Sequence, residues 1–133
     1  MAINGKKKGE AGEREAAAYL TKILELDEKA ERELGQARKG GADILGIGHF
    51  IFEVKRQEKL ELRKWWRQVA KAARNSENAF AIPVVIYRRN RQPWRILISA
   101  AFVGLDYGFL RLDEPEAVKW LKMKYDEFKC LPI

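Results

Sequence analysis

Apolar residues along the chain follow two spacings, one typical of helices and one typical of strands. Recurrence at three and four residues predicts helices over about 10–26, 62–74 and 114–128. Compact apolar runs predict strands over 43–47, 50–55, 81–87 and 94–99. A tight turn at Gly48 and His49 should join the first two strands, and the last two should pair across the turn "RRNRQP".

The order of these elements predicts an α/β fold with a mixed central β-sheet flanked by helices. Residues 27–41 are polar and contain glycine, so they should form a loop or a short edge strand. The chain has 133 residues, no internal repeat and no linker-like segment. We therefore expect residues 1–133 to form a single domain.

The charge balance favours a polyanionic partner. Lysine and arginine outnumber acidic residues by 26 to 19, which gives a net charge of +7. A basic protein of this kind suits nucleic acid better than a neutral or acidic substrate. The single cysteine, Cys130, excludes an intramolecular disulfide, and the single histidine, His49, argues against a structural zinc site.

The polar character of the chain also bears on its location. The first ten residues are charged and lead into no apolar run, and no stretch approaches roughly 18 uninterrupted apolar residues. We therefore expect a soluble cytoplasmic protein without membrane contact, located in the host cytoplasm if the chain is of viral origin.

Three acidic residues stand where the surrounding pattern predicts burial. Glu53 shares one face of its strand with Lys55, because alternate residues of a strand point the same way. Glu13 lies on the apolar stripe of the first helix, and Asp43 heads an apolar strand after two glycines. Each has an ordinary structural explanation, as an ion pair at a strand end, a first-turn helix acid or a turn aspartate.

Together these residues predict a metal site. Three carboxylates that converge at the edge of a sheet would repel one another unless a cation lay among them. Oxygen ligands with open positions suit Mg²⁺, with Mn²⁺ able to substitute, better than zinc. Such a cation can activate water and neutralise charge on a phosphodiester, and Lys55 can donate to the attacking water or to the charged transition state.

The same residues resemble the motif of the PD-(D/E)XK nucleases, and within them the archaeal-type Holliday-junction resolvases. The motif is "GAD" at 41–43 followed by "EVK" at 53–55, with Ala42 where many members have proline. The opening "KKGEAGERE" is similar to the basic and glycine-containing segment of the resolvases, and "IPVVIYR" with "WRILIS" is similar to their late strands. The resemblance covers about residues 6–100 and implies a restriction-endonuclease-like core.

The resemblance also implies a role for each site residue. Asp43 and Glu53 would bind the metal with the backbone carbonyl of Val54, and Lys55 would be the catalytic lysine. Glu13 corresponds to the N-terminal active-site glutamate and would reach the metal through water. Within the wider superfamily a glutamine on the following helix supports the site, which makes Gln68 a candidate.

Basic residues on the second helix and at the ends of elements are candidate DNA contacts. These candidates are Lys7, Lys8, Arg38, Lys39, Lys64, Arg67, Lys71 and Arg89. On the helix, an ordinary solvated face would show the same spacing. Trp65 and Trp66 are adjacent, so either one is exposed as a dimer or DNA-stacking residue or both pack at the edge of the core.

The predicted function is a Mg²⁺-dependent, structure-specific DNA endonuclease that resolves four-way junctions by phosphodiester hydrolysis. A homodimer is expected, because symmetric cleavage of two strands needs two active sites. One alternative is a repair or restriction-type nuclease of the same superfamily that acts on flap or duplex DNA. The other is a DNA-binding module without catalytic activity.

Overall fold

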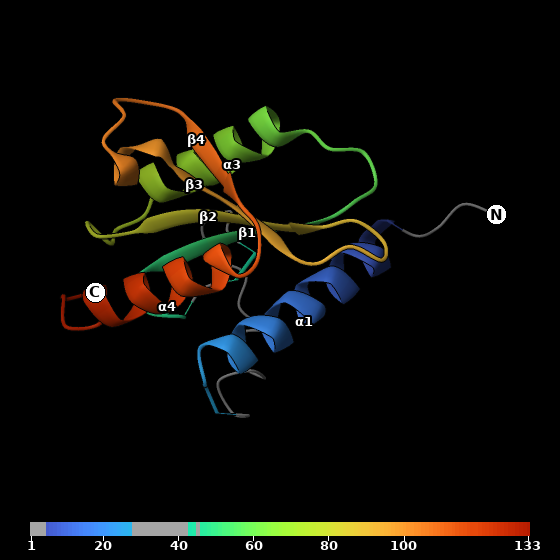
Figure 1. Ribbon diagram of the computed structural model, residues 1–133, viewed down its shortest axis with the longest axis horizontal. Helices are drawn as coiled ribbons and strands as arrows, with labels where there is room; N and C mark the ends of the chain where they lie inside the picture. The colour runs from blue at the N-terminus through green and yellow to red at the C-terminus, as the bar shows by residue number, and fades with distance from the viewer. Residues whose placement is uncertain (1–4, 28–42, 45) are drawn as a thin grey trace.

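The structure is a computed structural model that describes residues 5–27, 43, 44 and 46–133 (Figure 1). Its elements, in chain order, are α1 (Gly5–Ile23), β1 (Phe50–Arg56), α3 (Leu62–Arg74), β2 (Ile82–Arg88), β3 (Arg95–Ser99), the short 3₁₀ helix η1 (Ala100–Val103), β4 (Phe109–Leu112) and α4 (Glu116–Phe128).

The four strands form one mixed sheet in the order β1, β2, β3, β4. β1 and β2 are parallel, and α3 forms the crossover that parallel neighbours require. The later pairs, β2 with β3 and β3 with β4, are antiparallel. The predicted α/β class, with a mixed sheet flanked by helices, is therefore confirmed, as is the pairing of the two late strands.

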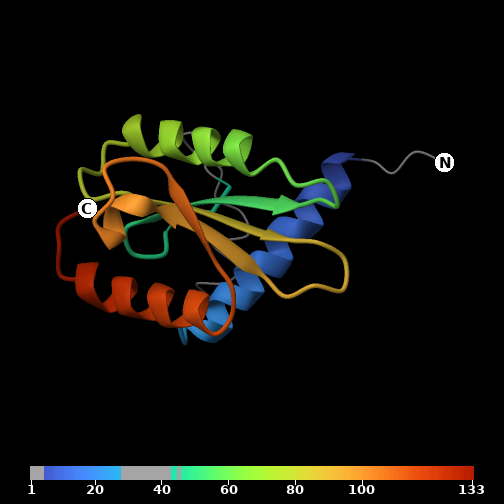
Figure 2. The same ribbon diagram turned by 45° about the horizontal axis from the view of Figure 1, so that its top comes forward.

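Helices cover both faces of the sheet, with α1 and α4 on one face and α3 on the other (Figures 1 and 2). The alternation of side chains along β1 explains this division, because Phe50, Phe52 and Val54 enter the core beneath α1 and α4. Ile51, on the opposite face, packs with Trp65 and Val69 of α3. Glu53 and Lys55 share the face of Ile51 and therefore lie on the α3 side of the sheet.

The expected strand over 43–47 was wrong in extent. In the described residues it is reduced to a single antiparallel bridge between Ile44 and Phe52. Gly46 has a φ of 95°, a left-handed backbone that turns the chain away from an extended path. The predicted turn at Gly48 and His49 is present, and nearly all of the polar segment expected after the first helix lies outside the described residues.

The part of the chain after residue 100 contains two elements that the apolar pattern did not predict, η1 and β4. β4 has only four residues, too few for a clear alternation of apolar and polar positions. Phe109 of β4 packs on Trp66, with ring centroids 5.9 Å apart, while Trp65 is 1 % exposed. The interpretation of both tryptophans as core or core-edge residues is therefore confirmed. Among the helices described, none has the length and apolar character needed to cross a membrane.

Candidate active site

Glu53 and Lys55 lie on β1, an outer strand of the four-stranded sheet. Lys55 Nζ is 3.6 Å from Glu53 Oε1, so the two charges form an ion pair on the α3 side. Glu53 is only 8 % exposed. In the part of the chain that the structure describes, its second oxygen, Oε2, is buried and has no hydrogen-bond partner. The described residues therefore leave the hydrogen-bonding capacity of this oxygen unfilled.

Asp43 reaches β1 from the chain segment along its outer edge. The backbone N–H of Asp43 donates to the carbonyl of Phe52 at 2.9 Å, and the backbone N–H of Val54 donates to Asp43 Oδ2 at 2.7 Å. In a strand the N–H and the C=O of one residue point to the same side, so the Val54 carbonyl faces this edge as well. The residues predicted as metal ligands, Asp43, Glu53 and the Val54 carbonyl, are thus neighbours.

Glu13 comes from the opposite side of the sheet, on α1. Next to Glu13, α1 packs very closely on β1. A Cβ added at Gly12 would lie only 2.8 Å from Cβ of Arg56. Arg56 also donates from Nε to Glu15 Oε2 at 3.2 Å, which joins the same turn of α1 to the end of β1. Glu13 is partly exposed beside these contacts.

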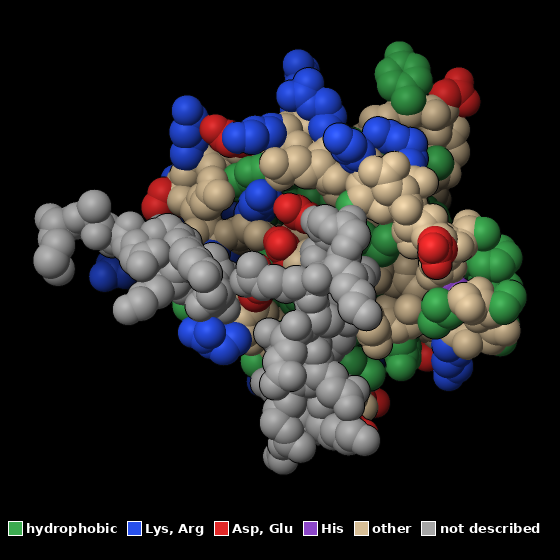
Figure 3. All heavy atoms as spheres, turned by 180° about the vertical axis from the view of Figure 1, so that it is seen from behind, with side chains coloured by type: hydrophobic (Ala, Val, Ile, Leu, Met, Phe, Trp, Pro, Cys, Tyr) green, Lys and Arg blue, Asp and Glu red, His purple; other side chains and the backbone are tan. Residues whose placement is uncertain are grey.

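The three acids share an electrostatic environment. Burial, together with the charges of Asp43 and Glu13, raises the pKa of Glu53 to about 7, although Lys55 lowers it in part. Repulsion of this kind is what a bound cation would relieve. Space-filling atoms show Asp and Glu side chains near the centre of this face, with Lys and Arg side chains beside them and above them over α3 (Figure 3).

The expected three-carboxylate metal site stays a prediction. Within residues 5–27, 43, 44 and 46–133, no group of three His, Cys, Asp or Glu side chains is arranged to hold a metal ion. Asp43, Glu53 and the Val54 carbonyl offer oxygen donors of the kind that a divalent cation prefers. Glu13 influences Glu53 through its charge.

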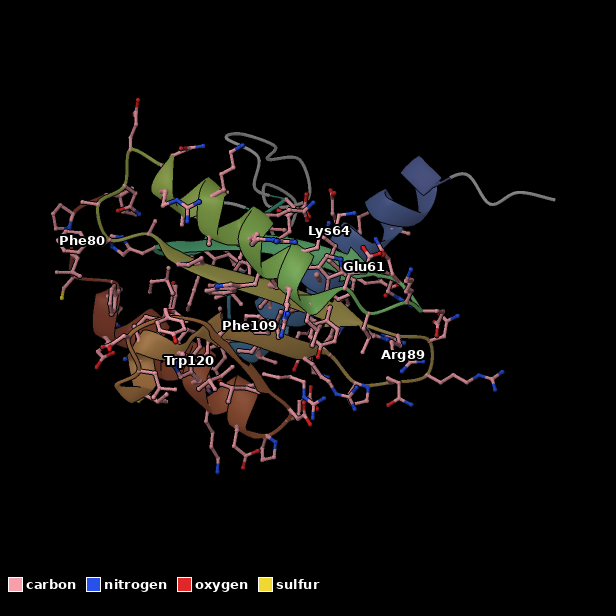
Figure 4. The ribbon with its side chains drawn as sticks, turned by 90° about the horizontal axis from the view of Figure 1, so that it is seen from above. Glu61, Lys64, Phe80, Arg89, Phe109 and Trp120 are labelled. Carbon is pink, nitrogen blue, oxygen red and sulfur yellow. The ribbon has the colours of Figure 1, made fainter. Side chains whose placement is uncertain are left out.

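The predicted DNA contacts are only partly within the described side chains. Lys64, Arg67 and Lys71 form an exposed stripe on α3, which we call the α3 basic stripe. Gln68 is exposed on the same helix. Arg89 lies in the loop between β2 and β3 (Figure 4). The side chains of Lys7, Lys8, Arg38 and Lys39 lie outside the part that is described.

Two acidic side chains moderate this basic surface. Glu61, just before α3, has Oε2 3.5 Å from Lys64 Nζ, and both side chains lie at the start of the helix (Figure 4). Glu58 accepts a hydrogen bond from Asn90 N at 2.7 Å and lies 3.8 Å from Arg89 Nε. These contacts join the loop after β1 to the loop after β2.

Polar residues farther along the sheet were not indicated by the amino-acid pattern. Tyr87 lies in register with Lys55 on one side and with Arg95 on the other. The residue types alone did not predict that Lys55, Tyr87 and Arg95 lie side by side. Their alignment depends on strand register, which local spacing does not reveal.

An outer strand that carries Glu-x-Lys, with an aspartate held against it, is the arrangement expected of a PD-(D/E)XK nuclease. The family model described as "Phage putative PDDEXK endonuclease" matches residues 4–127. The chain belongs to this family of endonucleases, and the prediction of the PD-(D/E)XK superfamily is confirmed. No curated protein and no solved structure gave a match. The resemblance to archaeal-type resolvases stays a prediction.

The raised pKa of Glu53 predicts a pH-dependent stability for the metal-free protein. A carboxyl whose pKa is higher in the folded state stabilises the fold below its unfolded pKa, and this contribution is lost as the pH rises through about 7. In EDTA, Glu53→Gln should therefore gain up to roughly 3 kcal/mol over the wild type between pH 4.5 and pH 8. Denaturant unfolding at several pH values measures this difference. The exposed Glu77→Gln should follow the wild type, and parallel pH profiles for Glu53→Gln and wild type would contradict the burial of a strained carboxylate.

Proposed function

We propose that the chain is a divalent-metal-dependent endonuclease that hydrolyses DNA phosphodiesters, with four-way junctions as its substrate. The observation that carries the proposal is the hydrogen bond from Val54 N–H to Asp43 Oδ2, which holds Asp43 close enough to Glu53 for its charge to act on that carboxyl. Family membership supports the nuclease activity, and phosphodiester hydrolysis is the chemistry that two carboxylates and a lysine at one strand edge can perform.

The chain's own groups divide the catalytic work. Asp43, Glu53 and the Val54 carbonyl would hold Mg²⁺ or Mn²⁺, and Glu13 would act through water. When bound, such a cation lowers the pKa of a water ligand and neutralises charge on the scissile phosphate. Lys55 Nζ, which lies 3.6 Å from Glu53 Oε1, would donate a hydrogen bond to the attacking water or to a phosphate oxygen.

The state of Glu53 links this chemistry to pH. A metal ligand must be deprotonated, and a carboxyl with a pKa of about 7 is only partly ionised near neutrality. Metal binding would therefore compete with a proton at Glu53. This competition favours cleavage at neutral to alkaline pH, where the carboxylate is available.

DNA binding would use the α3 basic stripe together with Arg89, Lys7, Lys8, Arg38 and Lys39. Phosphate contacts of this kind position the duplex without reading its sequence. Gln68, between Lys64 and Lys71 on α3, would support the active site. A surface of this composition suits recognition of DNA shape, which is the requirement for a junction-specific enzyme.

A homodimer would present two such sites to one junction. Its contact surface is best placed away from the active edge. Exposed apolar side chains gather in η1 and directly after it: Phe102, Val103, Leu105 and Tyr107. Tyr107 is 89 % exposed, which is unusual for a large aromatic side chain. An isologous contact through this surface would leave both active edges accessible.

Loss of either acidic ligand should abolish cleavage and spare DNA binding. Asp43→Asn and Glu53→Gln each remove a ligand charge, which weakens the metal site but also reduces repulsion of phosphate. We expect cleavage in Mg²⁺ to fall by orders of magnitude, with affinity retained or increased. Lys55→Ala should bind DNA and metal but fail in turnover.

Cleavage of matched four-way, flap and linear duplex DNA, in Mg²⁺ and in Mn²⁺, measures these effects. The exposed Glu77→Gln is the control for loss of a negative charge and should cleave at the wild-type rate. Mg²⁺-dependent cutting at the normal rate by Asp43→Asn or Glu53→Gln would remove that residue from the catalytic set.

The α3 basic stripe should contribute to the salt dependence of binding. Removal of one lysine or arginine that binds a phosphate should lower the slope of log affinity against log salt by about 0.9. Replacement of Lys64, Arg67 and Lys71 by alanine should therefore flatten the dependence, as measured by fluorescence anisotropy at several salt concentrations. Replacement of Lys119, Lys122 and Lys129 of the α4 region changes the net charge equally, and an identical slope for both triple variants would show that the stripe is a solvated face.

A junction should bind more tightly than linear duplex of equal length. Both subunits of a dimer can engage one four-way junction, so the second contact is effectively intramolecular and should favour the junction by roughly 10²-fold. Competition binding in Ca²⁺, light scattering for mass and mapping of the cut sites in Mg²⁺ test this. Equal affinities, a monomer at working concentration or cuts that are not paired across the junction would contradict the junction specificity. The protein would then be a nuclease that acts on another DNA substrate.

A further inference from the structure

The loop between β2 and β3 concentrates positive charge at one end of the sheet. Residues 88–95, which span this loop, read "RRNRQPWR", with four arginines and no acid. Arg89 and Arg91, at the tip, are exposed. In Figure 2 the loop extends past the end of β1, the strand that carries Lys55. A polyanion bound at this end would relieve the repulsion between the arginines.

The loop begins close to the candidate active site. Lys55 of β1 is in register with Tyr87 of β2, and Arg89 follows Tyr87 by two residues. Residues of a strand advance by about 3.3 Å and neighbouring strands lie about 4.8 Å apart, so the backbone of Arg89 is roughly 8 Å from that of Lys55. A DNA strand advances by about 3.4 Å along the helix axis per nucleotide. Phosphates within a few nucleotides of one held at Lys55 would therefore meet the loop.

The backbone at the tip of the loop is unusual for its sequence. The backbone N–H of Gln92 donates to the carbonyl of Arg89 at 3.1 Å, which closes a tight turn. Arg91, the third residue of this turn, has a φ of 62°. Glycine or asparagine normally occupies such a left-handed position, because larger side chains crowd the backbone there. Arg91 is exposed and gains no core packing in return, and strain of this kind is characteristic of functional loops.

Glu58 joins the tip of the loop to the segment that connects β1 with α3. Its Oε1 accepts a hydrogen bond from the backbone N–H of Asn90 at 2.7 Å. Its Oε2 lies 3.8 Å from Arg89 Nε. The hydrogen bond is made to the residue between the two exposed arginines, so Glu58 fixes the backbone from which both side chains extend.

The base of the loop is held on the opposite face of the sheet. The guanidinium carbon of Arg88 lies 5.9 Å from the centroid of the Trp94 ring, and Trp94 is 5 % exposed. Arg88 Nη1 is also 3.8 Å from Glu15 Oε2 of α1. Contacts on both faces of the sheet therefore hold the loop in one orientation. A contact surface that is already ordered loses less conformational freedom when it binds a ligand.

We propose that the β2–β3 loop is a preorganised contact for the DNA backbone beside the scissile phosphate, in which Arg91 binds a phosphate and Glu58 positions the loop. This inference rests on the nuclease function proposed above and extends it by naming where the bound strand leaves the active site. An arginine guanidinium can donate two parallel hydrogen bonds to one phosphate. Arg89, already a candidate contact, would bind the same strand.

Arg91→Asn separates the charge of Arg91 from the shape of the turn. Asparagine accepts the left-handed backbone, so the melting temperature should stay the same or rise. We expect DNA affinity to fall roughly tenfold and the slope of log affinity against log salt to decrease by about 0.9. The probes are a linear duplex and a four-way junction in EDTA, so that no cleavage interferes. Lys122→Gln, on the exposed side of α4, removes an equal charge, and equal slopes in the two variants would overturn the contact at Arg91.

Two variants of Glu58 test its positioning role. Glu58→Gln removes the negative charge and keeps an oxygen that can accept from Asn90 N, whereas Glu58→Ala removes both. If Glu58 acts only through its charge, both variants should bind DNA more tightly by the same factor. If Glu58 positions the loop, Glu58→Ala should bind roughly fivefold more weakly than Glu58→Gln. Equal affinities of the two variants, with melting temperatures that show both are folded, would overturn the positioning role.

Failure of this inference can be separated from failure of the nuclease function. Cleavage by the wild type in Mg²⁺, with wild-type DNA binding by Arg91→Asn, would remove the loop contact and leave the nuclease intact. Weakened binding by Arg91→Asn, in a protein whose wild type cleaves no DNA in Mg²⁺ or Mn²⁺, would support the loop contact and contradict the proposed activity.

Discussion

The hydrogen bond from Val54 N to Asp43 Oδ2 joins the two parts of the candidate active site. Asp43 precedes β1 by several residues and stays near it through the bridge between Ile44 and Phe52. Because β1 is an outer strand of the sheet, the side of Val54 that faces away from β2 is available to this carboxylate. In a strand in the middle of the sheet, the same backbone groups would form hydrogen bonds with a second neighbouring strand.

The position that makes Glu53 useful also strains the fold. A carboxylate that is nearly buried and faces two other acids is held partly protonated, with a pKa of about 7. Functional sites commonly combine burial with like charges in this way, since the unfavourable charge becomes favourable once a cation binds. Lys55 offsets part of the repulsion, and the close packing of α1 at Gly12 keeps Glu13 within its influence.

The two faces of the sheet differ in the size of their apolar cores and in their polar residues. The face beneath α1 and α4 holds the larger apolar core, and on that face Arg56 joins β1 to α1 through Glu15. The face beneath α3 combines a smaller core with a polar margin that contains Lys55, Tyr87 and Arg95. The side-chain alternation of β1 and β2 produces both surfaces from the same strands.

Residue types and local spacing were sufficient to predict the main helices and three of the strands, because the periods of helices and strands depend on residues that are neighbours in the chain. They also indicated the acidic residues that stand at positions where the pattern predicts burial. They did not predict β4, whose four residues are too few for a clear alternation of apolar and polar positions. Only the tertiary structure decided which edge of β1 faces Asp43, how strongly Glu53 resists ionisation and that Lys55, Tyr87 and Arg95 align. Each of these depends on strand order and register, which arise from contacts between segments far apart in the chain.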